Sequence, residues 1–341
     1  MSVFRASYAD LITSRPVVTY NHVPSMAVNG NTKPTQSIHL DIDNGLFTNN
    51  QFNGQFVSRQ DHRLYEFSDV PAFLRGNPFI KTGYRVYLSR RDCFKSLFIW
   101  SNESINIWSH LLGFIVFFLL MLYDNIFFTQ VTRGTFSDRV IVTLGLLCFQ
   151  FCMLCSAGYH LFRCESELTD RSWFAYDLTG ISVGLLGCYL PGVYFGFYCL
   201  SVWRDIYLII VSLLFVTVML CQTDPRYYSE KYYWSRALLY CGLTGYGIMP
   251  TFHWIYLSGG FHTELVQMFT PDVAVVYMLG MTAFYFYITK TPEKCFPGHF
   301  DYIGSSHQIW HILIVFSFLW WHKSGYDMLL FYKDNSCPVP E

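Results

Sequence analysis

An apolar stretch at residues 107–128, IWSHLLGFIVFFLLMLYDNIFF, decides the fold of this chain. It is long enough to cross a bilayer as a helix, which takes roughly 20 predominantly apolar residues. Six further apolar stretches of similar length follow, at about residues 140–162, 173–197, 206–221, 236–257, 271–289 and 306–331. We therefore expect an all-α, polytopic membrane protein whose seven transmembrane helices form one bundle.

The composition of the whole chain agrees with a membrane protein. Of its 341 residues 52% are hydrophobic and only 14% are charged, which is too apolar for a soluble domain of this size. The net charge of −1 offers no basic surface to a nucleic acid, so we expect no partner of that class. Most of the eleven cysteines, Cys199 among them, fall in or beside apolar stretches, which argues against a disulfide framework. Pro191 and Pro250, in the third and fifth stretches, predict kinks.

The sequence divides into four predicted regions. Residues 1–60, rich in Asn, Gly, Ser and Thr, are expected to form a disordered cytosolic tail. Residues 61–106 are expected to form a juxtamembrane segment with a short interfacial helix around RRDCFKSLFIW at 90–100. Residues 107–331 form the bundle and residues 332–341 a short tail. Lys and Arg are roughly twice as frequent on the side that holds the N-terminus, which predicts a cytosolic N-terminus and a lumenal C-terminus.

Three histidines at the ends of these stretches are candidates for a metal site. His307 and His311 are four residues apart, so a helix presents both on one face. His160 closes the second stretch, and the alternating direction of the spans brings it to the side where the seventh begins. A polar pair satisfied by water is the alternative for His307 and His311, because the spacing H-x-x-x-H alone does not decide between the two.

Two more polar residues are expected at the same depth, Asp177 near the start of the third stretch and Ser156 one turn before His160. Polar side chains inside a membrane are costly and usually mark a function. Three imidazoles would leave the fourth position of a tetrahedral Zn²⁺ open, as in catalytic sites, where zinc lowers the pKa of a bound water. Asp177 and Ser156 would then orient that water. The alternative for Asp177 is a carboxylate near the N-terminus of a helix, where the helix dipole stabilises its negative charge.

Four separated blocks of the sequence match a known family in their order. They are SNESINIWSHLLG at 101–113, SAGYH at 156–160, AYDLTGI at 175–181 and SSHQIWH at 305–311. These blocks resemble the signature segments of the progestin and adipoQ receptor family, and the resemblance covers roughly residues 66–331. It implies a seven-helix bundle with a cytosolic N-terminus and with zinc held by His160, His307 and His311.

The resemblance implies two different roles. In the adiponectin-receptor branch the matching site is linked to hydrolysis of ceramide-like lipid amides, with the counterparts of Ser156 and Asp177 close to the metal-bound water. Together with NPFIKTGYR at 77–85, the blocks are most similar to a member that anchors Raf kinase at the Golgi and lowers MAP-kinase signalling. We therefore expect a Golgi anchor that binds a Raf-type kinase through its juxtamembrane segment, with lipid-amide hydrolysis as the alternative. The sequence lacks the D/E-R-Y and N-P-x-x-Y patterns of receptors that couple to heterotrimeric G proteins.

Overall fold

The computed structural model describes residues 63–222, 224–335 and 337, so the prediction for residues 1–60 lies outside the described residues. The described chain is almost entirely helical, with one isolated β-bridge between Tyr65 and Tyr84 and no strand. Its α-helices are α2 (Arg90–Lys95), α3 (Ser104–Thr132), α4 (Phe136–Phe162), α5 (Glu167–Gly196), α6 (Ser201–Cys221), α7 (Tyr233–Tyr246), α8 (Ile248–Leu257), α9 (Glu264–Thr289) and α10 (Ser306–Asp334). Its 3₁₀ helices are η1 (Phe67–Asp69), η2 (Ala72–Leu74), η3 (Ser96–Phe98), η4 (Pro225–Tyr228), η5 (Glu230–Tyr232) and η6 (Gly260–His262).

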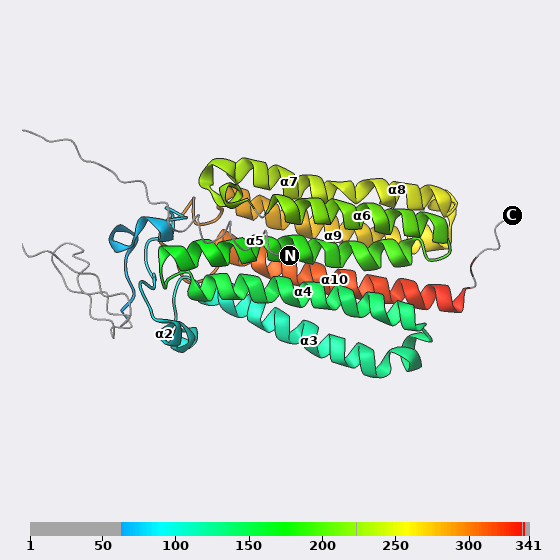
Figure 1. Ribbon diagram of the computed structural model, residues 1–341, viewed down its shortest axis with the longest axis horizontal. Coiled ribbons are helices and arrows are strands. Elements are labelled where there is room, and N and C mark those ends of the chain that lie inside the picture. Colours follow the sequence, from blue (N-terminus) through cyan, green and yellow to red (C-terminus); the bar gives the residue numbers. More distant parts are fainter. Residues whose placement is uncertain (1–62, 223, 336, 338–341) are drawn as a thin grey trace, which may run out of the picture. The chain divides into compact units, whose positions relative to one another are not determined.

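Five helices in the described part of the chain are long and apolar enough to cross a membrane: α3 over Ser104–Phe127, α4, α5, α6 and α9. The consecutive helices α7 and α8, and the 29-residue α10, run alongside these five (Figure 1). The all-α, polytopic membrane fold is therefore confirmed. Membrane crossing by α7, α8 and α10 and the cytosolic side of the N-terminus remain predictions.

Proline affects the two predicted kink positions differently. The fifth apolar stretch forms two helices, because α7 ends at Tyr246 and α8 begins at Ile248, with Gly247 between them. Pro250, in the first turn of α8, has no N–H to donate to the carbonyl of Tyr246. Pro191 lies inside α5, which continues through it as a single helix of 30 residues.

Helix α10 is the centre of the bundle, since it packs against α3, α4, α5 and α9. The rings of Phe149 on α4 and Phe318 on α10 stack with their centroids 4.2 Å apart. Helices α4 and α5 approach closely at Gly187, where a Cβ would lie only 2.6 Å from the Cβ of Cys148. Small residues at such crossings let helix backbones pack tightly in a membrane.

The juxtamembrane segment forms its own small hydrophobic cluster, made of Val70, Leu74, Ile80 and Tyr84. It is bound to the loop between α9 and α10 by two buried carboxylates. Asp301 accepts hydrogen bonds from the backbone N–H groups of Lys81 and Thr82 at 2.9 and 2.8 Å. Glu293 accepts one from the Asn77 side chain at 3.0 Å and one from the Ser306 N–H at 2.8 Å. These bonds fix the point at which α10 begins.

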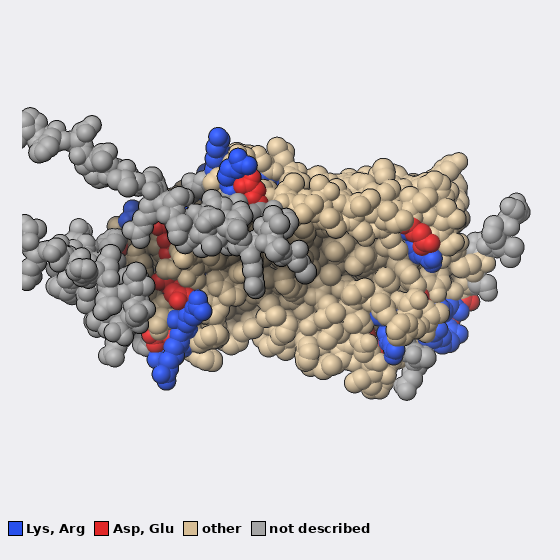
Figure 2. Space-filling model, viewed as in Figure 1, with Lys and Arg blue, Asp and Glu red and all other residues tan. Residues whose placement is uncertain are grey.

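A short helix occurs where an interfacial helix is predicted. In α2 and η3 the side chains of Phe94 and Phe98 are 56% and 83% exposed, whereas Leu97 packs against the buried cluster around Cys93. On the face shown in Figure 2, charged side chains gather near the ends of the long helices and leave the middle uncharged. This distribution suits an apolar belt facing lipid, because charges at the bilayer centre are costly.

The expectation that Cys199 is an unpaired apolar cysteine was wrong. Cys199, just after α5, forms a disulfide with Cys337, which follows α10, across a separation of 138 residues. The pairing arises because α5 and α10 end on the same side of the bundle, which brings two chain segments together that composition alone does not connect. The other nine described cysteines, including Cys152 and Cys155 on α4, are free.

Candidate metal centre

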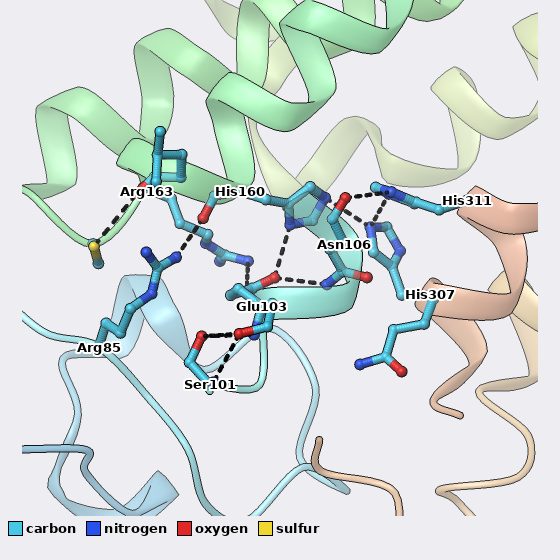
Figure 3. Close-up of polar contacts among 12 residues, drawn as sticks. Arg85, Ser101, Glu103, Asn106, His160, Arg163, His307 and His311 are labelled. Carbon is cyan, nitrogen blue, oxygen red and sulfur yellow. Dashed lines mark hydrogen bonds and ion pairs between the residues drawn. The ribbon is translucent and has the colours of Figure 1, made fainter. Parts of the chain in front are cut away.

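The three predicted histidines meet at one end of the bundle. His160 lies in the last turn of α4, while His307 and His311 lie in the first turns of α10 (Figure 3). The Nε2 atom of His307 lies 3.2 Å from the Nε2 atom of His160 and 3.2 Å from that of His311. His160 and His311 are buried, and His307 is partly exposed. Two helices distant in sequence thus place three imidazole nitrogens around one point.

The start of α10 is fixed by its own sequence. Ser305 and Gln308 form a capping box: the Ser305 side chain accepts a hydrogen bond from the backbone N–H of Gln308, and the Gln308 side chain accepts one from the backbone N–H of Ser305. The Gln308 side chain also accepts a hydrogen bond from the Gly304 N–H at 2.6 Å. A helix that begins at a defined residue points His307 and His311 in defined directions.

Hydrogen bonds to other residues settle which nitrogen of the His160 and His311 rings faces the centre. The Nδ1 of His160 lies 2.8 Å from Oε2 of Glu103, and the Nδ1 of His311 lies 3.2 Å from the backbone oxygen of Asn106. Both oxygens can only accept, so both Nδ1 atoms carry hydrogen. The Nε2 atoms of the neutral rings are then unprotonated and available as ligands, as in the carboxylate–histidine–metal arrangement.

Glu103 is held in its charged form. It lies just before α3 and is bonded by the Asn106 side chain at 2.7 Å and by Arg163 at 3.2 Å, besides His160. Burial opposes ionisation of this carboxyl, but the hydrogen bonds from His160 and Asn106 and the positive charge of Arg163 outweigh burial and hold its pKa well below the usual range. An ionised Glu103 fixes the orientation of the His160 ring.

The donor set fits a zinc ion. With both Nδ1 atoms protonated, the Nε2 atoms of His160 and His311 present lone pairs, and the single Nε2 hydrogen that a neutral His307 can carry satisfies only one of them. A cation at the centre removes that conflict. Zinc–nitrogen bonds of about 2.0–2.1 Å in a tetrahedron separate the ligand atoms by about 3.3 Å, close to the 3.2 Å from His307 to each of the other two nitrogens. His160, His307 and His311 are the described residues that form a potential metal-binding group.

A cavity of about 810 Å³ opens beside the three histidines and extends between α5, α7, α8, α9 and α10. Ser156 and Asp177 also line it, and their side chains interact with each other. Along α10 the lining runs from Ser306 to Met328, and most of the wall away from the histidines is apolar. The structure therefore brings together all five residues that the sequence nominated, at the polar end of a long apolar chamber.

Sequence reasoning missed two residues that support the site, Glu103 and Asn106. Both lie in the block SNESINIWSHLLG, where Asn102-Glu103-Ser104 resembles a glycosylation acceptor. The signal that could have found Glu103 is an acidic residue at the mouth of an apolar span, on the side where the three histidines were expected.

Fold and site together define a class of protein: an all-helical membrane protein with three converging histidines at one end of an internal cavity. A family model described as haemolysin-III related matches residues 98–322. The human protein "Progestin and adipoQ receptor family member 3" is 48% identical over 277 residues, which cover 81% of this chain and 89% of that protein. This chain therefore belongs to the haemolysin-III-related family, among its progestin and adipoQ receptors.

More distant relatives span plants and insects. "Heptahelical transmembrane protein 1" of Arabidopsis thaliana is 31% identical over 287 residues, covering 80% of this chain and 81% of that protein. The "Adiponectin receptor protein" of Drosophila melanogaster is 30% identical over 291 residues, covering 82% of this chain and 62% of that protein.

Proposed function

We propose that this protein binds zinc through His160, His307 and His311 and hydrolyses ceramide-like lipid amides. The observation that carries the proposal is the position of the three Nε2 atoms at the head of the cavity that Asp177 and Ser156 also line. Three protein ligands leave one position of a tetrahedral zinc open, as in catalytic rather than structural sites. When bound, zinc would supply Lewis acidity to water or to the amide carbonyl.

The chain's own residues have separate tasks in this reaction. The apolar wall along α5 and α10 holds the lipid chain and places the amide beside the histidines. Asp177 accepts a proton from the attacking water, and Ser156 holds the Asp177 carboxylate in position. Cleavage of the carbon–nitrogen bond then gives a fatty acid, which takes the hydroxyl group of water, and an amine, which takes the remaining proton.

The first test is the zinc content and the lipid-amide turnover of the purified protein. We expect about one zinc per chain, lost together with turnover in the His307→Ala/His311→Ala variant. Asp177→Ala should keep its zinc and lose turnover, because it removes the base and leaves the ligands. A folded parent without zinc would overturn the metal site. A zinc-loaded parent that cleaves no ceramide would overturn the hydrolase.

A second role, compatible with the first, is that of a Golgi membrane anchor that sequesters a Raf-type kinase and lowers MAP-kinase signalling. The similarity in family and sequence described above favours this role. The juxtamembrane segment is suited to it, since it folds around its own cluster and exposes Phe94 and Phe98. Vesicles carrying the full chain should retain the kinase on flotation, and the double histidine variant should retain it equally. Vesicles that retain no kinase would contradict the anchor.

The anchor requires the juxtamembrane segment to face the cytosol. The disulfide between Cys199 and Cys337 supports this orientation, because disulfides persist in oxidising compartments such as the secretory lumen. Both cysteines lie at the end of α5 or α10 remote from His160 and His307. After reduction, a membrane-impermeant thiol reagent should label Cys337 only in opened Golgi vesicles. Labelling of Cys337 in sealed vesicles would reverse the orientation.

A further inference from the structure

His110 is a fourth histidine at the site. It lies on α3, one turn after Asn106, and its ring stacks on that of His311 with the centroids 3.8 Å apart and the planes 15° from parallel. Only 3% of its surface is exposed, and it is one of the residues that line the cavity. The stack supports one face of the His311 ring.

The nitrogens of His110 are the unusual feature. Neither Nδ1 nor Nε2 makes a well-formed hydrogen bond with a described residue, and the ring interacts only weakly with the backbone of His311. The rings of His160 and His311, by contrast, both have a bonded Nδ1. Burial of a polar group without a hydrogen-bond partner is unfavourable, because the group gives up its hydrogen bonds to water. A buried ring that lines the cavity without a well-formed hydrogen bond at either nitrogen therefore leaves both atoms able to bind a molecule in the cavity.

The chemistry of a neutral imidazole matches that of a lipid amide. The ring offers one N–H donor and one acceptor nitrogen, while a secondary amide offers a carbonyl acceptor and an N–H donor. A ceramide headgroup adds hydroxyl groups, which can do either. The His110 ring can therefore pair with both the carbonyl and the N–H of such a headgroup.

We propose that His110 binds the polar headgroup of the cavity's lipid and so positions the amide beside the histidine centre. The inference rests on the proposed lipid-amide substrate and adds the residue that recognises its headgroup. His110 has two separable parts: the ring face supports His311, and the ring nitrogens bind the lipid.

The substitution His110→Phe separates these parts, because phenylalanine keeps a stacking ring and removes both nitrogens. We measure zinc content, and the affinity of the purified protein for N-oleoyl sphingosine in detergent micelles, by native mass spectrometry in the cold. His110→Phe should keep the zinc of the parent and bind this lipid about tenfold more weakly, the effect of one or two lost hydrogen bonds. His110→Ala should lose affinity for both zinc and lipid.

A matched control is His253→Phe on α8. His253 bonds to the Tyr207 hydroxyl at 2.9 Å and is not among the residues that line the cavity, so its loss should leave the affinity for the lipid unchanged. If the parent binds N-oleoyl sphingosine and His110→Phe binds it equally well, the inference about His110 is wrong and the proposed function stands. If the parent does not bind this lipid at all, both are wrong.

Discussion

Removal of the Glu103 carboxylate should weaken zinc binding without touching a ligand. Glu103 accepts the Nδ1 hydrogen of His160 at 2.8 Å and is itself bonded by Asn106 and Arg163. Loss of such a supporting partner typically costs 10–100-fold in metal affinity, or about 1.4–2.7 kcal/mol. Glu103→Ala deletes the acceptor and leaves the half-buried Arg163 without one of its two carboxylate partners, so we expect a loss of zinc affinity near 100-fold.

A graded substitution tests whether charge or shape matters. Glu103→Gln keeps an acceptor oxygen for His160 but turns an amide N–H₂ toward a neighbouring donor, so we expect a loss nearer tenfold. Asp170→Asn is the control, because the Asp170 side chain bonds to Arg163 at 3.2 Å, as Glu103 does, but is not the hydrogen-bond acceptor of His160. Its zinc affinity should equal that of the parent.

The assay is competition for zinc against a chromogenic chelator in detergent, with thermal unfolding recorded to confirm that each variant is folded. Combined with His160→Ala, the change Glu103→Ala should add little, because both act through one ligand. If a folded Glu103→Ala protein binds zinc as tightly as the parent does, the carboxylate does not support His160 and the argument is refuted.

Three further outcomes test the packing around the site. Gly187→Ala should destabilise the protein by about 1–3 kcal/mol by overpacking α4 against α5, whereas Gly280→Ala, which has open space around the added Cβ, should keep the parent's unfolding temperature; equal temperatures for the two would contradict the close approach. Cys337→Ser should abolish the disulfide-linked peptide of a non-reducing digest and lower the unfolding temperature, since chain entropy gives up to about 5 kcal/mol for a loop closed over 138 residues. Glu293→Gln should cost about 1–3 kcal/mol and increase hydrogen exchange at residues 77–83; unchanged exchange would show that this carboxylate does not bind the segment to α10.

The helices were predictable because an apolar stretch that matches the thickness of a bilayer has few alternatives to a helix. The break at Gly247 was harder to place, since Pro250 predicts a kink but not the residue at which the helix ends. His160, His307 and His311 could be brought together from helical spacing and the direction of the spans alone. Both predictions rest on the spacing of residues along a single helix and on the side of the membrane at which each helix ends.

Contacts between helices were beyond that reasoning. The bond of Glu103 to His160, the stack of His110 on His311 and the Cys199–Cys337 disulfide all join segments whose relative rotation the sequence pattern leaves open. Asp301 and Glu293 are further examples, because each has a partner in the juxtamembrane segment more than 200 residues away. Such contacts depend on which face of each helix turns toward the other helices. The sequence does not reveal this face, because a membrane-spanning helix is apolar both toward lipid and toward its neighbours.

The separation of the ligands has a consequence for biosynthesis. His160 and His307 are 147 residues apart, and α10 is the last helix of the described chain. During synthesis the earlier helices leave the ribosome and enter the membrane while the ligands on α10 do not yet exist. Metal capture must therefore be a late event, and a chain that stops before α10 can hold no more than one of the three nitrogens.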